Sequence, residues 1–139
     1  MLSGVPNTRS MADNPTVLVL DDEPGVRNSM AQLLRVYGYD AVTASTLDEA
    51  RGLLQTADVE AVILDVGLQQ GDTGLDLLRT IRERTEFQKV PVLILTGGVL
   101  TDAEEMLITR HRAFLFYKPE GFDTLLNFLD TLTGRDRAH

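Results

Sequence analysis

Polar residues that can do chemistry follow the short apolar runs of this 139-residue chain. Asp21 and Asp22 come directly after TVLVL, and Asp65 comes after EAVIL. Thr96 follows VPVLIL, and Lys118 follows AFLFY. Acids, a hydroxyl and an amine are together the groups that a site for a metal ion and a phosphate requires.

A cluster of these acids would need a cation. Carboxylates repel one another by roughly 4 kcal/mol per pair for charges ~4 Å apart at an effective dielectric of 20. Mg²⁺ suits such a cluster because it takes oxygen ligands, keeps several waters and commonly uses one or two carboxylates plus phosphate oxygens. Asp21 and Asp22 are the acids best placed to hold the metal.

The remaining groups fit phosphoryl transfer, which needs in-line placement and neutralisation of charge on the equatorial oxygens. Mg²⁺, Lys118 and the Thr96 hydroxyl could each supply that neutralisation. We expect a carboxylate nucleophile that forms an aspartyl phosphate. Asp65 is the best candidate because it is a single acid at the end of a central apolar run.

The elements that would position these groups alternate between two periods, short β-rich runs and longer amphipathic stretches, as in repeated strand–helix units. The expected strands are Thr16 to Leu20, Asp40 to Thr43, Glu60 to Leu64, Val90 to Leu95 and Ala113 to Tyr117. Asp40 to Thr43 is short and polar and is expected at an edge. The others are nearly continuously apolar, as parallel strands covered on both faces are.

Apolar residues at helical spacing predict one buried stripe on each intervening helix. The first stripe comprises Val26, Met30, Leu33, Leu34 and Tyr37, and the fourth comprises Ala103, Met106 and Leu107. Pro24 suits a first helical turn, and Thr46 with Glu49 and Thr101 with Glu104 predict capping boxes.

This alternation predicts a (βα)5 fold, a doubly wound parallel sheet between helices. The flavodoxin-like strand order 2-1-3-4-5 is the favoured one of the few topologies that right-handed crossovers allow. Ligands bind such sheets outside the carboxyl ends of the strands. Asp21, Asp22, Asp65, Thr96 and Lys118 are all expected at that edge.

Composition restricts the partners. The net charge of −8 and the pI near 4.6 disfavour direct binding to nucleic acid or to an anionic membrane surface. No apolar run approaches the ~20 residues of a membrane helix, and the absence of cysteine fits an intracellular, cytoplasmic protein. A protein partner or a small ligand is expected.

One domain is expected over residues 15–133. We expect residues 1–14 to be a disordered tail; alternatively, Met11 is the natural start and the residues before it are an addition. We expect residues 134–139 to be a flexible C-terminus.

The chain resembles the CheY-like receiver domains of two-component response regulators from roughly Thr16 to Leu132. The resemblance depends on the DD pair after the first strand, the lone Asp65, the TG pair at Thr96, and the KP pair at Lys118. It is specific because these residues occur in the family's order on the matching elements.

The resemblance implies a signalling switch in a phosphorelay. Asp65 would accept a phosphoryl group from a phosphohistidine on a sensor histidine kinase or a phosphotransfer protein. Asp22, Asp65 and the backbone carbonyl of Gly67 would bind Mg²⁺ directly, and Asp21 would act mainly through metal-bound water. Such a domain can also catalyse its own phosphorylation from a small phosphodonor and its own dephosphorylation.

The resemblance also implies how the signal leaves. Thr96 would turn towards the phosphoryl oxygens, Lys118 would pair with them, and the Lys118–Pro119 bond would be cis. The surface from Thr101 to Leu132 would then bind a downstream protein effector, with a homodimer left open.

Three features depart from the family pattern. In the loop DVGLQQGDTG after Asp65, Gln69 stands in place of the family's proline and the loop is one residue longer before Gly74, which leaves the loop geometry open. The position three residues before the lysine, often a switch aromatic, is Leu115, flanked by Phe114 and Phe116, so either aromatic gating is lost or the register differs. The two positions that tune phosphoryl lifetime are Gly67 and Gly98, which leaves that lifetime open.

Other interpretations remain. A haloacid-dehalogenase-like phosphohydrolase uses the same kinds of residues but wants an Asp-x-Asp signature, which LDDEP does not supply. A flavodoxin-like nucleotide or flavin binder would need a Gly-rich or Ser/Thr-rich phosphate loop after the first strand. A receiver-shaped scaffold without phosphate chemistry is a further alternative, and the role of Glu23 is ambiguous because acids also favour helix starts.

Overall fold

The computed structural model describes residues 14–21, 23–66, 72–118 and 121–134. The predicted tails lie mostly outside these ranges. Strands and helices alternate in the order β1 (Thr16–Leu20), α2 (Pro24–Val36), β2 (Asp40–Ala44), α3 (Leu47–Thr56), β3 (Val59–Val66), α4 (Asp72–Glu83), the 3₁₀ turn η1 (Thr85–Phe87), β4 (Val92–Thr96), α5 (Asp102–Arg110), β5 (Phe114–Tyr117) and α6 (Gly121–Thr133).

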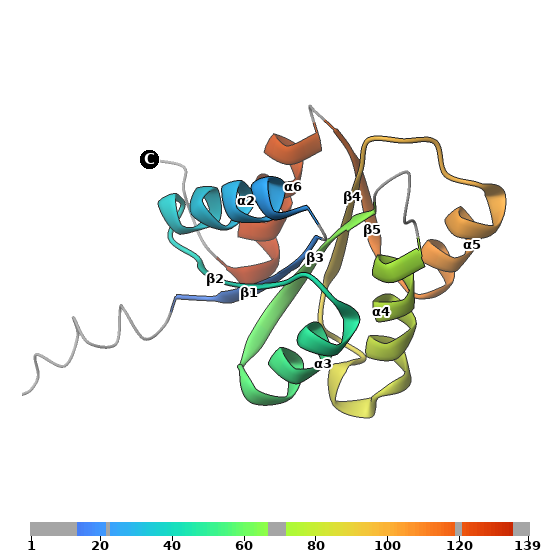
Figure 1. Ribbon diagram of the computed structural model, residues 1–139, viewed down its shortest axis with the longest axis horizontal. Coiled ribbons are helices and arrows are strands. Elements are labelled where there is room, and N and C mark those ends of the chain that lie inside the picture. Colours follow the sequence, from blue (N-terminus) through green and yellow to red (C-terminus); the bar gives the residue numbers. More distant parts are fainter. Residues whose placement is uncertain (1–13, 22, 67–71, 119–120, 135–139) are drawn as a thin grey trace, which may run out of the picture.

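The strands form one parallel sheet in the order β2-β1-β3-β4-β5, which confirms the predicted fold class and topology (Figure 1). β2 lies at one edge, as its polar sequence predicted, and β5 lies at the other. β1, β3 and β4 are the interior strands, so their carboxyl ends stand next to one another.

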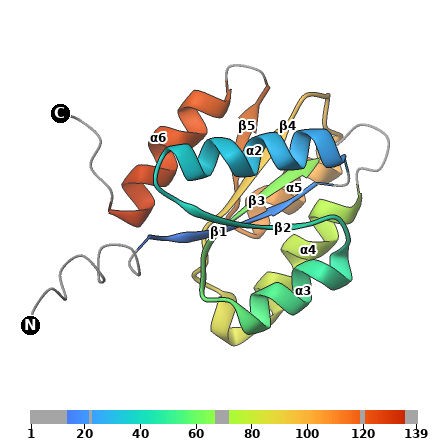
Figure 2. The ribbon, with the colours of Figure 1, turned by 60° about the vertical axis from the view of Figure 1, so that its left-hand side comes forward.

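Each face of the sheet is covered by helices, and the apolar residues form a separate core on each side. The side chains of α2 and α6 pack on one face, and those of α3, α4 and α5 pack on the other (Figures 1 and 2). Leu18 and Ile63 lie in opposite cores and are both fully buried, as expected for strands covered on both sides. Within the part of the chain that is described, no helix is long and apolar enough to cross a bilayer.

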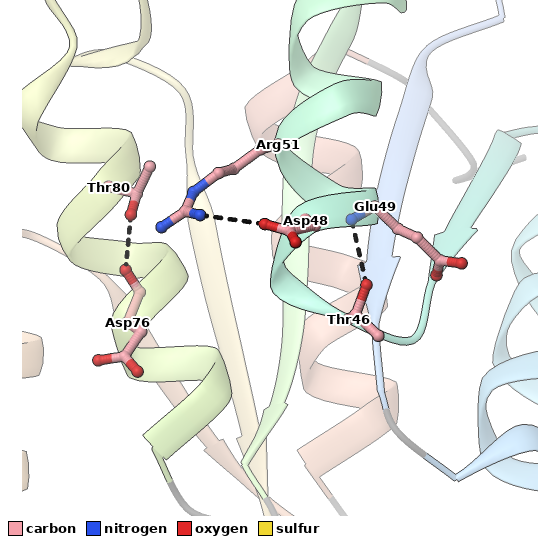
Figure 3. Close-up of polar contacts among 6 residues, drawn as sticks. All are labelled: Thr46, Asp48, Glu49, Arg51, Asp76 and Thr80. Atoms are coloured by element: carbon pink, nitrogen blue, oxygen red, sulfur yellow. Dashed lines mark hydrogen bonds and ion pairs between the residues drawn. The ribbon is translucent and has the colours of Figure 1, made fainter.

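Local signals at the helix ends agree with the structure in most places. Pro24 is the first residue of α2, and Thr101 and Glu104 form the predicted capping box of α5. At α3 the Thr46 hydroxyl accepts the backbone N–H of Glu49 at 3.2 Å (Figure 3). The second bond of that predicted box would join the Glu49 carboxylate to the Thr46 backbone N–H. The Glu49 carboxylate instead accepts from the backbone N–H and the hydroxyl of Ser45.

Several predicted strand boundaries were wrong by one or two residues. β2 runs to Ala44 rather than Thr43, β3 begins at Val59 rather than Glu60, and β5 begins at Phe114 rather than Ala113. β3 runs through Val66 rather than ending at Leu64, because the pairing of β3 with β4 continues through Val66 and Thr96. β4 begins at Val92 rather than Val90, because the Val90 N–H and carbonyl bond to the Phe87 carbonyl and the Arg82 guanidinium. Asp65 and Thr96 therefore lie inside strand ends rather than just past them.

The predicted buried stripes of two helices were correct only in part: Met30 and Leu34 of α2 are buried and Leu107 of α5 packs against the core, but other positions differ. In α2, Ala31 is buried and Leu33 is 38% exposed. In α5, Ile108 is buried and Met106 is 62% exposed. Periodicity identified the helices but not the angle at which each meets the sheet, which depends on the neighbouring elements.

Candidate functional site

Four of the predicted site residues lie at the carboxyl edge of the sheet on neighbouring strands. Asp21 follows β1, Asp65 lies near the end of β3, Thr96 ends β4 and Lys118 follows β5. The register aligns these ends, since Leu20 pairs with Leu64. Residues up to 97 positions apart in sequence, from Asp21 to Lys118, thus meet at one edge.

Asp65 and Lys118 form an ion pair. The Lys118 ammonium donates to Oδ2 of Asp65 at 2.5 Å. The Asp65 side chain is 5% exposed and that of Lys118 is 34% exposed, so the carboxylate is buried while the amine reaches solvent. A charge-assisted hydrogen bond of this kind is stronger than a neutral one and fixes the position of the candidate nucleophile.

Asp21 is buried beside Asp65, and no cationic side chain among the described residues forms an ion pair with it. Its Oδ1 accepts the backbone N–H of Glu23 at 3.0 Å, whereas Oδ2 is buried and has no partner among the described residues. The pKa of Asp21 is raised from 3.8 to about 7, mainly by burial and also by the neighbouring Asp65, against the opposing effects of the Glu23 N–H and Lys118. The charged form of Asp21 is therefore short of a favourable partner.

These observations fit a hard cation. A buried carboxylate oxygen without a partner, next to a second carboxylate, is a donor set that Mg²⁺ prefers. Within the described ranges no group of three or more His, Cys, Asp or Glu side chains gathers. The predicted ligands Asp22 and Gly67 lie outside those ranges.

Thr96 lies beside the pair on β4. Its side chain is buried, with the residue 1% exposed, and its hydroxyl accepts the backbone N–H of Gly98 at 3.2 Å. The Lys118 backbone N–H donates to the Thr96 carbonyl at 2.8 Å, which holds the end of β5 against β4. A Cβ on Gly97 would lie 3.6 Å from Cδ of Lys118, so the loop after β4 packs closely along the lysine stem.

Leu115 faces the core formed with α3, α4 and α5. Phe114 and Phe116 face the other way and pack on Phe128 of α6, with ring centroids 4.5 and 5.9 Å apart. The position that carries a switch aromatic in the family is thus leucine in this register. Pro119, and with it the predicted cis bond, lies outside the described residues.

Two neighbours of the site were not predicted. Glu23 is the N-cap of α2 and contributes its backbone N–H to Asp21, while its side chain makes no capping bond. Arg27 donates from Nη1 to the backbone carbonyl of Asp21 at 2.9 Å. An arginine in the first turns of an amphipathic helix has the sequence pattern of an ordinary surface charge, so no local signal identified it.

Comparison with known proteins agrees with this geometry. The family model described as response regulator receiver domain matches residues 17–130. Response regulator Rre1 of Synechocystis sp. is 35% identical over 130 residues, which cover 92% of this chain and 55% of Rre1. Several other curated response regulators are matched over only 17% of their length, so the chain corresponds to a part of these relatives.

Solved structures show the same fold. A response regulator receiver protein from Pseudomonas putida is 33% identical, with a TM-score of 0.70 over 85% of this chain and 97% of that one. Response regulator TrrA from Thermotoga maritima, in complex with Mg²⁺-BeF, is 25% identical, with a TM-score of 0.71 over 85% of this chain and 98% of that one.

The parallel 2-1-3-4-5 sheet with its helices on both faces is a CheY-like α/β domain. The chain belongs to the receiver-domain family of two-component response regulators, a family whose function is phosphorelay signal transduction. Neither a dehalogenase-like phosphohydrolase nor a flavin-binding domain is favoured by these relatives.

Proposed function

We propose that Asp65 is the phosphoryl acceptor of this receiver domain, in an Mg²⁺-dependent reaction with a phosphohistidine of a sensor histidine kinase or phosphotransfer protein. The observation that carries the proposal is the buried Asp65 carboxylate, paired with Lys118 at 2.5 Å and next to the unpartnered oxygen of Asp21. We place this exchange in the cytoplasm, in agreement with the lack of cysteine.

Asp21, Asp22, Asp65 and the Gly67 carbonyl would hold the Mg²⁺, with Asp21 acting mainly through metal-bound water. When bound, the ion supplies positive charge to the acids and to the phosphoryl oxygens. The family relationship to TrrA, whose structure contains Mg²⁺-BeF, supports this assignment.

The transfer itself uses groups already in place. A carboxylate oxygen of Asp65 attacks phosphorus, the phosphorus–nitrogen bond of the donor breaks, and the imidazole leaves with the bonding electron pair and is then protonated. The Lys118 ammonium, now on Asp65, would move to the phosphoryl oxygens and neutralise charge there. The Thr96 hydroxyl accepts a bond from the Gly98 N–H, so its own proton is not used in that bond and could be donated to the same oxygens.

The product would act through the surface of α5, β5 and α6. This surface exposes apolar side chains: Met106 is 62% exposed, Tyr117 49% and Phe114 38%. Tyr117 directly precedes Lys118, so a movement of the lysine reaches this surface within one residue. A downstream protein effector or a second copy of the chain would bind here. Conformational gating by Leu115, rather than by an aromatic, is part of this proposal.

The test is intact-mass measurement after incubation with Mg²⁺ and acetyl phosphate. We expect a phosphoryl adduct on the wild type and none on Asp65→Asn. Asp48→Asn is the matched control, because Asp48 is a 93% exposed carboxylate on α3, and it should be modified like the wild type. An adduct that persists in Asp65→Asn would contradict the assignment of Asp65. No adduct on the wild type at any Mg²⁺ concentration would favour a scaffold without phosphate chemistry.

A further inference from the structure

Arg27 connects the first turn of α2 to the end of β1 in two ways. Its backbone N–H donates to the Glu23 carbonyl at 2.9 Å, which closes the start of the helix. Its side chain turns back, and Nη1 donates to the Asp21 carbonyl at 2.9 Å in a partly buried position. Arg27 therefore contacts both Glu23, at the start of α2, and Asp21, at the end of β1.

With this bond, Asp21 is held at every polar group but one. Its backbone N–H donates to the Ala44 carbonyl of β2 at 3.2 Å, its carbonyl accepts from Arg27, and Oδ1 accepts from Glu23. Within the described part of the chain, only the buried Oδ2 has no partner. A residue fixed in this way presents one oxygen, in one orientation, next to Asp65.

The choice of acceptor is informative. A guanidinium that paired with the Asp21 carboxylate would neutralise it and compete with a metal ion, because arginine binds carboxylates in bidentate fashion. Arg27 instead bonds the backbone carbonyl and leaves the carboxylate oxygen unpaired.

We propose that Arg27 is a positioning residue for the metal site: it holds the Asp21 carbonyl so that the unpaired carboxylate oxygen stays directed at the cation. The proposal rests on the Mg²⁺ site of the proposed function. Outer residues that orient metal ligands typically affect affinity by about 10- to 100-fold.

The sign of the effect separates positioning from electrostatics. If Arg27 acted only through its charge, its removal should tighten Mg²⁺ binding, because the positive guanidinium repels the positive ion. Loss of positioning should weaken it. We therefore expect Arg27→Gln to bind Mg²⁺ about tenfold more weakly than the wild type, in a calorimetric titration of the unphosphorylated protein.

Arg35 offers a matched control on the same helix. It is an exposed residue whose Nη2 donates to the Ala41 carbonyl at 2.9 Å in a partly buried bond, but Ala41 lies near the start of β2, away from the carboxyl edge. Arg35→Gln removes the same charge and the same kind of bond, and it should leave Mg²⁺ affinity within about twofold of the wild type. Circular dichroism and thermal melting establish that each variant is folded.

Unchanged or tighter binding by Arg27→Gln, or equal weakening by Arg35→Gln, would overturn the proposal. If Arg27→Gln does not fold, Arg27→Lys takes its place: it keeps the charge but not the planar guanidinium, so weakening of about threefold or more is expected, and unchanged affinity would contradict positioning. Absence of Mg²⁺ binding by the wild type is a different result, because it would contradict the metal site itself.

Discussion

At the residue scale, Asp21 and Asp65 lie side by side with opposite surroundings. Asp65 has the Lys118 ammonium at 2.5 Å, whereas Oδ2 of Asp21 has no partner within the described ranges. Burial is the largest of the influences that together raise the pKa of Asp21 to about 7. The ionisation of Asp21 should therefore respond to an added cation.

This asymmetry predicts a pH dependence of stability without Mg²⁺. The folded state holds the Asp21 proton more tightly than the unfolded state between the unfolded pKa near 4 and the folded value of about 7. Stability is therefore greatest at the acid end of this window and falls as the pH rises through it. We expect the wild type to lose roughly 2 to 4 kcal/mol between pH 4 and 7.5 relative to Asp21→Asn, which has no titrating group there.

Urea unfolding at a series of pH values measures both proteins. The difference between the two free energies of unfolding, rather than either curve alone, reports Asp21, because other groups titrate in both. If the free energies of unfolding of the wild type and Asp21→Asn changed in parallel with pH, the pKa of Asp21 would not be raised in the folded state. Saturating Mg²⁺ should remove most of the loss, because the cation stabilises the charged carboxylate.

At the element scale, one buried arginine joins three segments near the amino ends of the strands, at the edge of the sheet opposite the site. Arg82 of α4 is 8% exposed and donates from Nε to the His111 carbonyl at 2.7 Å. Its Nη1 donates to the carbonyls of Phe87, Gln88 and Val90 at 3.1, 3.2 and 2.8 Å. The end of α4, the η1 turn and the turn between α5 and β5 are thus held by one guanidinium.

Replacement of Arg82 should destabilise the fold strongly. Arg82→Met keeps the aliphatic stem but removes the donors for four carbonyls, and unsatisfied buried groups cost roughly 1 to 3 kcal/mol each when water cannot reach them. We expect a loss of about 3 kcal/mol in urea unfolding. Arg79→Met is the control on the same helix, because Arg79 forms only an exposed ion pair with Asp76 at 2.9 Å and should cost less than about 1 kcal/mol. Equal losses for the two variants would refute the bridging role of Arg82.

At the scale of the whole molecule, the charge of −8 means that any cation will stabilise the fold to some extent by screening. Specific binding must exceed that general effect. An ion that binds only the folded state stabilises it by about 2.7 kcal/mol at 100 times its Kd. The expected result is a rise of several degrees in Tm with millimolar MgCl₂.

Sodium chloride at equal ionic strength controls for screening in this thermal melt. Asp65→Asn controls for the site, since it removes one proposed ligand without changing the rest of the surface. We expect the shift in Tm to be largest for the wild type in MgCl₂ and small in the other combinations. A shift of equal size in sodium chloride would mean that Mg²⁺ acts on the net charge alone.

The sequence by itself determined the elements, their order and the polar residues at the strand ends. Apolar runs and helical spacing depend on the local backbone period, which is set by the chain regardless of what surrounds it. The capping box at Thr101 and the helix start at Pro24 are local in the same sense. Because parallel strands end at a common edge, Asp21, Asp65, Thr96 and Lys118 could be placed together without coordinates.

Only the tertiary structure decided which side chains of those elements are buried and which contact another element. The exposure of Leu33 and Met106, the side of β5 on which Leu115 lies, and the burial of Arg82 all depend on neighbours distant in sequence. Arg82 contacts a carbonyl 29 residues away, and the Tyr39 hydroxyl donates to Asp130, 91 residues away. Arg27 contacts Asp21, a near neighbour in sequence, but the proposed role of this contact in a metal site depends on the position of Asp65 on the adjacent strand. Periodicity carries no information about such partners, because the same residue pattern is compatible with many packing angles until the sheet and both helical layers are assembled.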